Sequence, residues 1–253
     1  MNKKTVIVTG AAHGIGEALV EKYISKGYFV GMFDINLEKL ENLYNKFGSE
    51  NCIYSYCDIS DKNSLEQAIE KFKKITNSRL NILCANAGII KQGEFDQFNS
   101  DDYSKLVNIN ALGTTQTILS SLDMLKTTPD SKVLIISSAS AIFGIPSFSV
   151  YAATKSYLKS LTESLSTEFR KFDIKVASIM PAFVKTNMTK DIDKKHKPEL
   201  NPEQIAELTY SASLKMKKLH YPIGKNIKSM ILMQKLLSAN KFQKIVEKTI
   251  YKK

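Results

Sequence analysis

The residues between 138 and 155 include three side chains that together can exchange a proton with a substrate. Tyr151 and Lys155 stand four positions apart, so on a helix their side chains share one face. A phenol titrates near pH 10, and a neighbouring ammonium group favours the phenolate. We therefore predict that Tyr151 is a general acid/base whose pKa Lys155 lowers, and that Ser138 orients the substrate oxygen.

A glycine-rich turn near the N-terminus has the features of a dinucleotide site. It has the form Gly-x-x-x-Gly-x-Gly, follows an apolar run and opens a helical pattern. Glycines let a pyrophosphate approach the backbone, and the free N–H groups of the helix start hold it. We expect the turn to bind the cofactor through Gly10, His13, Gly14, Ile15 and Gly16.

An acidic residue after the second apolar run indicates which dinucleotide is bound. Asp34 stands 18 positions past Gly16 and is followed by Ile35 and Asn36. A carboxylate there accepts hydrogen bonds from the ribose hydroxyls and repels a 2′-phosphate, and no arginine follows to neutralise that phosphate. The sequence predicts NAD(H) rather than NADP(H), with Asp34 and Ile35 at the adenosine; the alternative is a solvated residue at a strand end.

Apolar runs alternate with helical patterns along most of the chain. Strands are expected at residues 4–9, 28–33, 52–57, 81–85, 132–137 and 175–180, and helices include 64–75, 103–125, 151–172 and 201–218. Strands that are apolar throughout are typical of a sheet covered on both faces. The pattern predicts an α/β fold, a single-domain Rossmann-like doubly wound parallel sheet with helices on both faces, over residues 1–253.

Together these motifs resemble the short-chain dehydrogenase/reductase (SDR) family. The resemblance covers most of the chain, and the matches follow the family's order: the glycine turn, Asp58, Asn86-Ala87-Gly88, Asn110, Ser138, Tyr151, Lys155 and the segment from Pro181 to Thr186. It implies an oxidoreductase that transfers a hydride between NAD(H) and a secondary alcohol or carbonyl substrate. The family usually has Pro-Gly where this chain has Pro181-Ala182.

The resemblance also assigns roles within the cofactor site. Asp58, beside Ile59, is implied to bind the adenine, and Asn86, Ala87 and Gly88 to support the sheet and touch the adenosine ribose. Thr186, in one segment with Pro181 and Val184, is implied to contact the nicotinamide.

A proton relay is the last role that the resemblance assigns. The family's asparagine stands three positions before a glycine, which selects Asn110 over Asn108. Asn110 is implied to hold a water that links Lys155 to solvent, and Asn108 is interpreted as structural.

Two other functions remain open. A non-catalytic NAD-binding sensor or interaction protein could use the glycine turn alone, although it has no need of the four catalytic residues. A sugar-nucleotide epimerase of the same family could use the same tyrosine and lysine, but roughly 65 residues after Thr186 leave little room for its substrate domain.

The net charge of +11 is concentrated in the last quarter of the chain. Residues 1–184 hold 20 basic and 19 acidic side chains, whereas residues 185–253 hold 16 and 6. Only two of the 36 cations are arginine, so no nucleic-acid partner is expected. Residues 185–200 are expected to form a substrate lid, and residues 226–253 a lysine-rich helical tail that packs on the core or a second subunit, or lies on an anionic membrane.

Composition limits where the protein works. No apolar run reaches the length of a membrane span or resembles a signal peptide, which favours a cytoplasmic protein. The three cysteines form no CxxC pair and are expected to be buried and reduced. No cluster has metal-ligand spacing, so we expect no metal. The resemblance implies a homodimer through the helices at 103–125 and 151–172, or a homotetramer.

Overall fold

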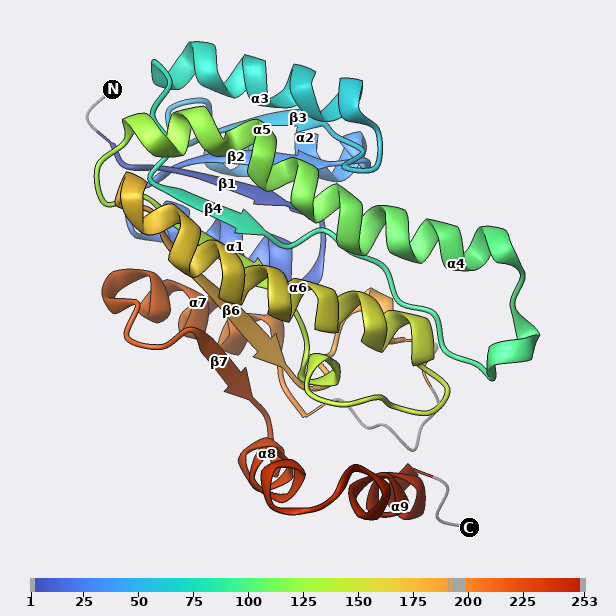
Figure 1. The fold of residues 1–253 in the computed structure, drawn as a ribbon. Helices are drawn as coiled ribbons and strands as arrows, with labels where there is room; N and C mark the ends of the chain where they lie inside the picture. The colour runs from blue at the N-terminus through green and yellow to red at the C-terminus, as the bar shows by residue number, and fades with distance from the viewer. Residues whose placement is uncertain (1–2, 191, 193–198, 251–253) are drawn as a thin grey trace.

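A single parallel sheet forms the centre of the computed structural model, which describes residues 3–190, 192 and 199–250 (Figure 1). Within these residues seven strands lie in the order β3-β2-β1-β4-β5-β6-β7, and every neighbouring pair is parallel. The order starts at β1, runs outward to β3 and then runs outward on the other side, as in a doubly wound fold. The predicted fold class is confirmed.

The strands are the apolar runs of the sequence, and most of their residues are buried. They are β1 (Thr5–Thr9), β2 (Phe29–Asp34), β3 (Cys52–Tyr56), β4 (Ile82–Ala85), β5 (Lys132–Ile136), β6 (Lys175–Pro181) and β7 (His220–Ile223). Their apolar character on both faces follows from the helices that cover each side of the sheet.

Two helical layers bury the two faces of the sheet (Figure 1). One core forms between the sheet and α1 (Gly14–Ser25), α2 (Leu37–Phe47) and α7 (Pro202–Lys215). The other forms between the sheet and α3 (Lys62–Thr76), α5 (Thr114–Thr127) and α6 (Ser149–Glu168). Helix α2 is a segment for which the sequence pattern made no prediction.

The helix expected over residues 103–125 is not uniform. It consists of α4 (Ser100–Val107), a π-helical turn at Asn108–Gly113, and α5. The turn carries the Asn110 side chain inward, where its amide donates to the Ile89 carbonyl at 2.9 Å and accepts from the Ile89 N–H at 2.8 Å. Turns of this kind insert one residue into a helix and are frequent at functional sites.

The C-terminal tail forms two helices beyond the edge strand β7 (Figure 1). They are α8 (Ile227–Leu236) and α9 (Ala239–Ile250), and residues 237–238 separate them, so the predicted helical tail is not one continuous helix. Phe242 and Val246 of α9 are each 2% exposed, so the apolar stripe of the tail faces the protein.

The three cysteines are buried and unpaired, as predicted. Burial raises the pKa of Cys52 to about 11 and that of Cys57 and Cys84 to about 12. None of the three is therefore a thiolate at neutral pH. In the part of the chain that the structure describes, no helix is both long and apolar enough to cross a bilayer.

Candidate functional site

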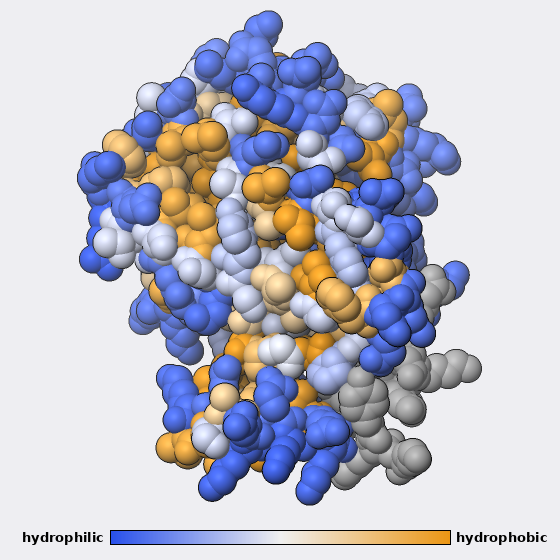
Figure 2. Space-filling view, turned by 45° about the vertical axis from the view of Figure 1, so that its right-hand side comes forward, coloured by the Kyte–Doolittle hydropathy of each residue, from blue (hydrophilic) through white to orange (hydrophobic). Residues whose placement is uncertain are grey.

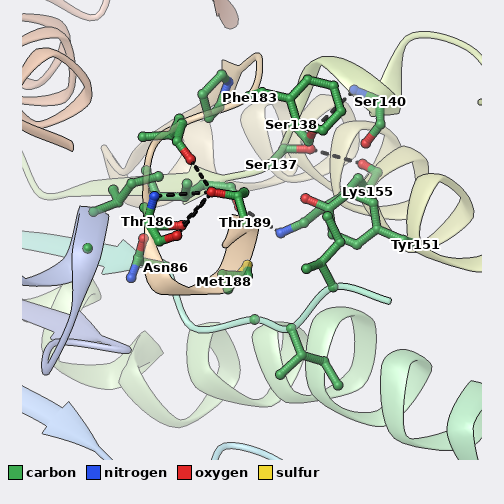
Figure 3. Close-up of a pocket in the computed structure, with 18 of the residues that line it drawn as sticks. Asn86, Ser137, Ser138, Ser140, Tyr151, Lys155, Phe183, Thr186, Met188 and Thr189 are labelled. Carbon is green, nitrogen blue, oxygen red and sulfur yellow. Dashed lines mark hydrogen bonds between the residues drawn. The ribbon is translucent and has the colours of Figure 1, made fainter. Parts of the chain in front are cut away.

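A cavity of about 410 Å³ lies at the carboxyl ends of the central strands (Figure 3). Residues that follow β1, β4, β5 and β6 line it, from Gly10 at one end to Tyr151 and Phe183 at the other. Parallel strands end at the same edge of a sheet, and this edge is where ligands bind in doubly wound folds. The fold therefore brings together segments that are far apart in the sequence.

The glycine turn admits no side chain at its closest approach. A Cβ added to Gly16 would lie 1.8 Å from the Gly10 carbonyl oxygen, and one added to Gly14, whose φ is +55°, would lie 2.9 Å from Thr186. The Asn86 amide holds the turn by donating to the Thr9 and Gly10 carbonyls at 2.9 and 3.2 Å. His13 precedes α1 without capping it through its side chain. The helix start therefore offers N–H groups that suit a pyrophosphate.

Asp34 lies at the same cavity and also braces the turn. Its carboxylate accepts from the Ala12 N–H and from the Asn36 N–H, each at 3.0 Å. These bonds fix the carboxylate beside the end of β1, where it presents negative charge to the cavity. Ile35, the next residue, is 62% exposed and does not line the cavity.

Ser138 and Tyr151 meet at the far end of the cavity. Ser138 follows β5 and caps a short 3-10 turn (Ala139–Ala141), accepting from the Ser140 N–H at 3.1 Å. Its hydroxyl is hydrogen-bonded to the phenol of Tyr151, which comes from the first turn of α6 (Figure 3). Two hydroxyls thus converge on the position where a substrate oxygen would accept from both.

The pKa of Tyr151 moves against the prediction. Burial of the phenol raises its pKa to about 12, and the hydrogen bond from Ser138 offsets only part of that rise. The Lys155 Nζ lies 5.7 Å from the centroid of the Tyr151 ring, and burial lowers its own pKa to about 8. The pKa of Tyr151 is therefore raised where the sequence predicts a lowering, because burial disfavours the charged phenolate.

Asn110 and Lys155 lie together behind the Asn86-Ala87-Gly88 turn. Asn110 is fully buried, whereas Asn108 is exposed. A Cβ added to Gly88 would lie 3.1 Å from Asn110 Oδ1 and 3.5 Å from Lys155 Nζ, and that ammonium donates to the Ile136 carbonyl at 3.2 Å. The π-helical turn therefore carries the asparagine to within a short distance of the lysine.

The structure brings most of the predicted residues to one cavity. Those that line it are Gly10, His13, Gly14, Ile15, Asp34, Asn86, Ala87, Gly88, Ser138, Tyr151, Lys155, Pro181, Val184 and Thr186. Gly16, Ile35, Asp58, Ile59 and Asn110 do not line it. The Asp58 carboxylate accepts from Ser60, and Ile59 is buried against Gly113.

An apolar wall of the cavity went unnoticed in the sequence. Its side chains come from the loop after β4, the loop before α6 and the segment after β6: Ile89, Ile90, Phe143, Ile145, Phe148, Phe183 and Met188. The apolar residues between 142 and 148 could have indicated this wall, because apolar side chains in a loop that forms no strand or helix must pack elsewhere.

The C-terminal helices hold part of this wall in place. The rings of Phe242, in α9, and Phe143 meet edge to face with centroids 5.1 Å apart. Gln234, in α8, donates from its side-chain amide to the Ile142 carbonyl at 2.6 Å. The tail therefore fixes the loop that presents Phe143 to the cavity.

We predict that Phe242→Ala raises the KM for a carbonyl substrate about two- to ten-fold, the equivalent of the ~0.5–1.5 kcal/mol of an edge-to-face pair. Because Phe242 lies outside the cavity, kcat and cofactor affinity should stay unchanged, and Phe242→Leu should restore part of the loss. Steady-state kinetics separate KM from kcat. An equal fall in kcat would show that the tail affects more than the loop.

The proposed lid is described only at its ends. Thr189 ties the first part by donating to the Val184 carbonyl at 2.7 Å, and Lys185 N–H donates to the Leu200 carbonyl at 2.8 Å. The predicted lid residues Lys194, Lys195, His196 and Lys197 lie outside the described residues. Among the described residues, no three His, Cys, Asp or Glu side chains gather as metal ligands do.

Ala182, which stands where the family usually has glycine, fits without strain. It is not among the residues with positive φ, and its N–H donates to the Ile223 carbonyl at 2.8 Å. The space its methyl group needs is left by Gly224, where an added Cβ would lie 2.5 Å from the Ala182 Cβ.

Comparisons with known proteins agree with this geometry. Residues 4–197 match the family model described as short chain dehydrogenase. An uncharacterised oxidoreductase of Staphylococcus aureus (strain MW2) is 28% identical over 207 residues, 82% of this chain and 89% of that protein.

Solved structures share the fold. An alcohol dehydrogenase of the archaeon Thermococcus sibiricus, complexed with 5-hydroxy-NADP, has a TM-score of 0.77 and 23% identity over 88% of this chain and 95% of that one. A short chain dehydrogenase/reductase of Burkholderia phymatum in complex with NAD has a TM-score of 0.83 and 20% identity over 92% of this chain and 93% of that one. With the family match spanning residues 4–197, the protein belongs to the short-chain dehydrogenase family of oxidoreductases.

Proposed function

We propose that the protein is an NAD(H)-dependent oxidoreductase that interconverts apolar ketones and secondary alcohols. The observation that carries the proposal is the hydrogen bond between Ser138 and Tyr151, at the apolar end of a cavity whose other end is the glycine turn. One end suits a dinucleotide, and the other offers two hydroxyls to a single oxygen atom.

The chain's own residues fit a nicotinamide dinucleotide. Gly10, Gly14 and the start of α1 would hold the pyrophosphate, Asp34 the adenosine ribose, and Thr186 the nicotinamide end. When bound, the nicotinamide supplies or accepts the hydride. Solved relatives of the fold were crystallised with NAD and with an NADP derivative, which supports this class of cofactor.

In the reducing direction Ser138 and Tyr151 bind the carbonyl oxygen of the substrate. Tyr151 is a phenol at neutral pH, since its pKa is about 12, and it donates its proton to that oxygen as the alcohol forms. Lys155 is cationic below its pKa of about 8 and stabilises the phenolate that remains. Asn110, beside Lys155, is the candidate for the water-mediated return of the proton.

The cofactor preference rests on Asp34. Its carboxylate is fixed by two backbone N–H groups, so it cannot turn away from a 2′-phosphate. Ile35 and Asn36 follow it and supply no positive charge. These observations support NAD(H) over NADP(H).

The test is oxidation of the reduced cofactor, followed by absorbance, with a medium-chain methyl ketone and the keto acid of equal length. We expect turnover of the ketone to exceed that of the keto acid, because the cavity wall is apolar. NADH should be at least about ten-fold better than NADPH, since Asp34 repels the added phosphate. A preference for NADPH would overturn the cofactor assignment. Binding of NADH with no turnover of any carbonyl would instead favour the sensor.

Two further properties belong to the proposal. Leu112, Leu119 and Tyr157 expose 48%, 67% and 40% of their surface on one side of the described molecule, which supports a homodimer through α5 and α6; light scattering tests it.

The unpaired, buried cysteines support a reducing compartment such as the cytoplasm, which cell fractionation tests.

A further inference from the structure

The C-terminal helices carry a surface of unusual charge. Glu247 is the one acidic residue between positions 225 and 248, and six lysines in that range are all exposed: Lys225, Lys228, Lys235, Lys241, Lys244 and Lys248. We propose that this surface docks the protein on an anionic membrane. It is called the basic face below and comprises these six lysines with Leu232 and Leu236.

The lysines of the basic face form no ion pair with the described part of the chain. Nine other lysines of the described chain lie within 4.0 Å of a carboxylate: Lys22, Lys46, Lys62, Lys73, Lys91, Lys126, Lys132, Lys159 and Lys175. Within the described residues, no such ion pair includes a lysine of the basic face. Carboxylates thus neutralise nine lysines between positions 22 and 175, whereas the six lysines of the basic face are exposed to solvent.

Exposed leucines accompany these cations on one side of α8. Lys228, Leu232, Lys235 and Leu236 are spaced so that all four side chains project within about a third of a helical turn. Leu232 is 57% exposed, and Leu236, at 73%, is the most exposed large apolar side chain in the described chain. Lysines beside leucines on an outward helix face are typical of segments that lie in the headgroup region.

The opposite sides of the two helices anchor them to the protein. Ile227 of α8 and Phe242 and Val246 of α9 are buried, so the outward direction of the basic face is fixed. In Figure 2 the lower end of the molecule, formed by these helices, is mostly blue with orange side chains at its edge. The face is thus a preformed surface of the folded protein.

Charge favours a membrane over the other possible partners. An isologous contact between two copies would bring the same unpaired lysines together, and like charges repel. Nucleic-acid surfaces rely on arginine forks and stacked aromatic rings. Residues 225–248 contain no arginine, and their single aromatic side chain, Phe242, is buried.

Sedimentation with vesicles tests the proposal on the full chain. The probes are vesicles of phosphatidylcholine alone and vesicles in which phosphatidylserine replaces about a third of it. We expect the protein to sediment with the anionic vesicles only, and less so as salt is added. The readout needs no turnover, so it is independent of the enzyme's substrate. No sedimentation with the anionic vesicles would overturn the proposal.

Variants locate the contact. Each lysine near an anionic surface contributes about a five-fold gain in binding, so Lys228→Glu/Lys235→Glu should weaken it at least about 25-fold. Leu232→Ser/Leu236→Ser should also weaken it, because leucine side chains enter the headgroup region. The matched control is Lys71→Glu/Lys74→Glu on α3, which changes net charge equally on two exposed side chains and should bind as the wild type does.

Three results would overturn the proposal at this stage. Equal losses in the α8 and α3 lysine variants would mean that net charge alone attracts the vesicles. Undiminished vesicle binding of the leucine variant would mean that the basic face attracts any polyanion by charge alone and does not enter the headgroup region. A changed solution mass of the α8 variants, with vesicle binding intact, would make the face an interface between copies of the chain.

Discussion

Tyr151→Phe should lower kcat for carbonyl reduction by about 10²–10⁴-fold, the usual contribution of a positioned acid or base. The substitution removes the hydroxyl that bonds to Ser138 and leaves the ring packed against Phe148, whose ring centroid is 6.4 Å away. NADH affinity, measured by fluorescence titration, should therefore be unchanged. The fall in kcat is then due to the missing proton donor and not to a change in the fold.

The control for this variant lies on the same helix. Tyr157→Phe removes a hydroxyl that bonds to Thr115 at 2.9 Å, outside the cavity, so turnover should persist. Near-normal turnover of the Tyr151 variant would contradict the assigned role of the phenol. An equal loss in both variants would point to a structural effect on α6.

Lys155→Met should make the protein more stable at pH 7 by about 2 kcal/mol while lowering its activity. Burial drops the lysine pKa from 10.5 to about 8, and at about 1.4 kcal/mol per pKa unit the buried cation costs roughly 3 kcal/mol. Losing the bond from Nζ to the Ile136 carbonyl offsets about 1 kcal/mol of that gain. Methionine has a similar length and no charge to desolvate.

The lowered pKa of Lys155 makes the stability difference between the variant and the wild type depend on pH. Between the folded pKa of about 8 and the unfolded pKa of 10.5, the unfolded chain binds more protons, so this lysine makes wild-type stability rise with pH. The advantage of the variant should therefore be full at pH 7 and shrink towards pH 10. Urea unfolding of both proteins at the two pH values measures the difference, in which the other titrating groups cancel.

A paired lysine on the same helix provides the comparison. Lys159, whose ammonium bonds to Glu163 at 2.5 Å, lies partly in solvent, and Lys159→Met should show no such gain at pH 7. If Lys155→Met destabilises the protein equally at both pH values, its charge carries no desolvation cost in the fold.

The sheet and the cofactor end of the cavity could be predicted because local sequence determines them. A buried parallel strand must be apolar on both faces, so β1 to β6 stand out as short runs. The glycine turn needs residues without side chains at fixed spacing, as the contact between Gly16 and the Gly10 carbonyl shows. Such constraints act within about ten residues of chain and are visible in one sequence.

The substrate end depends on tertiary contacts that local patterns do not encode. Phe143 belongs to a loop without periodicity, and its position depends on Phe242, which stands 99 residues later. The spacing of Tyr151 and Lys155 predicted their shared helix, but not the desolvation that raises the tyrosine pKa. Gly224 likewise explains Ala182 only once β6 and β7 are adjacent.

The π-helical turn at Asn108–Gly113 changes the phase of a continuous helical rod. One additional residue rotates the side chains after it by about 100° about the helix axis. The first half, α4, packs against α6, whereas the second half, α5, packs against β4 and α3. A uniform α-helix of the same sequence would have a single apolar stripe, which could pack against only one of these two sets of neighbours. Asn110, at the point of rotation, thus stands where the rod passes from one set of neighbours to the other.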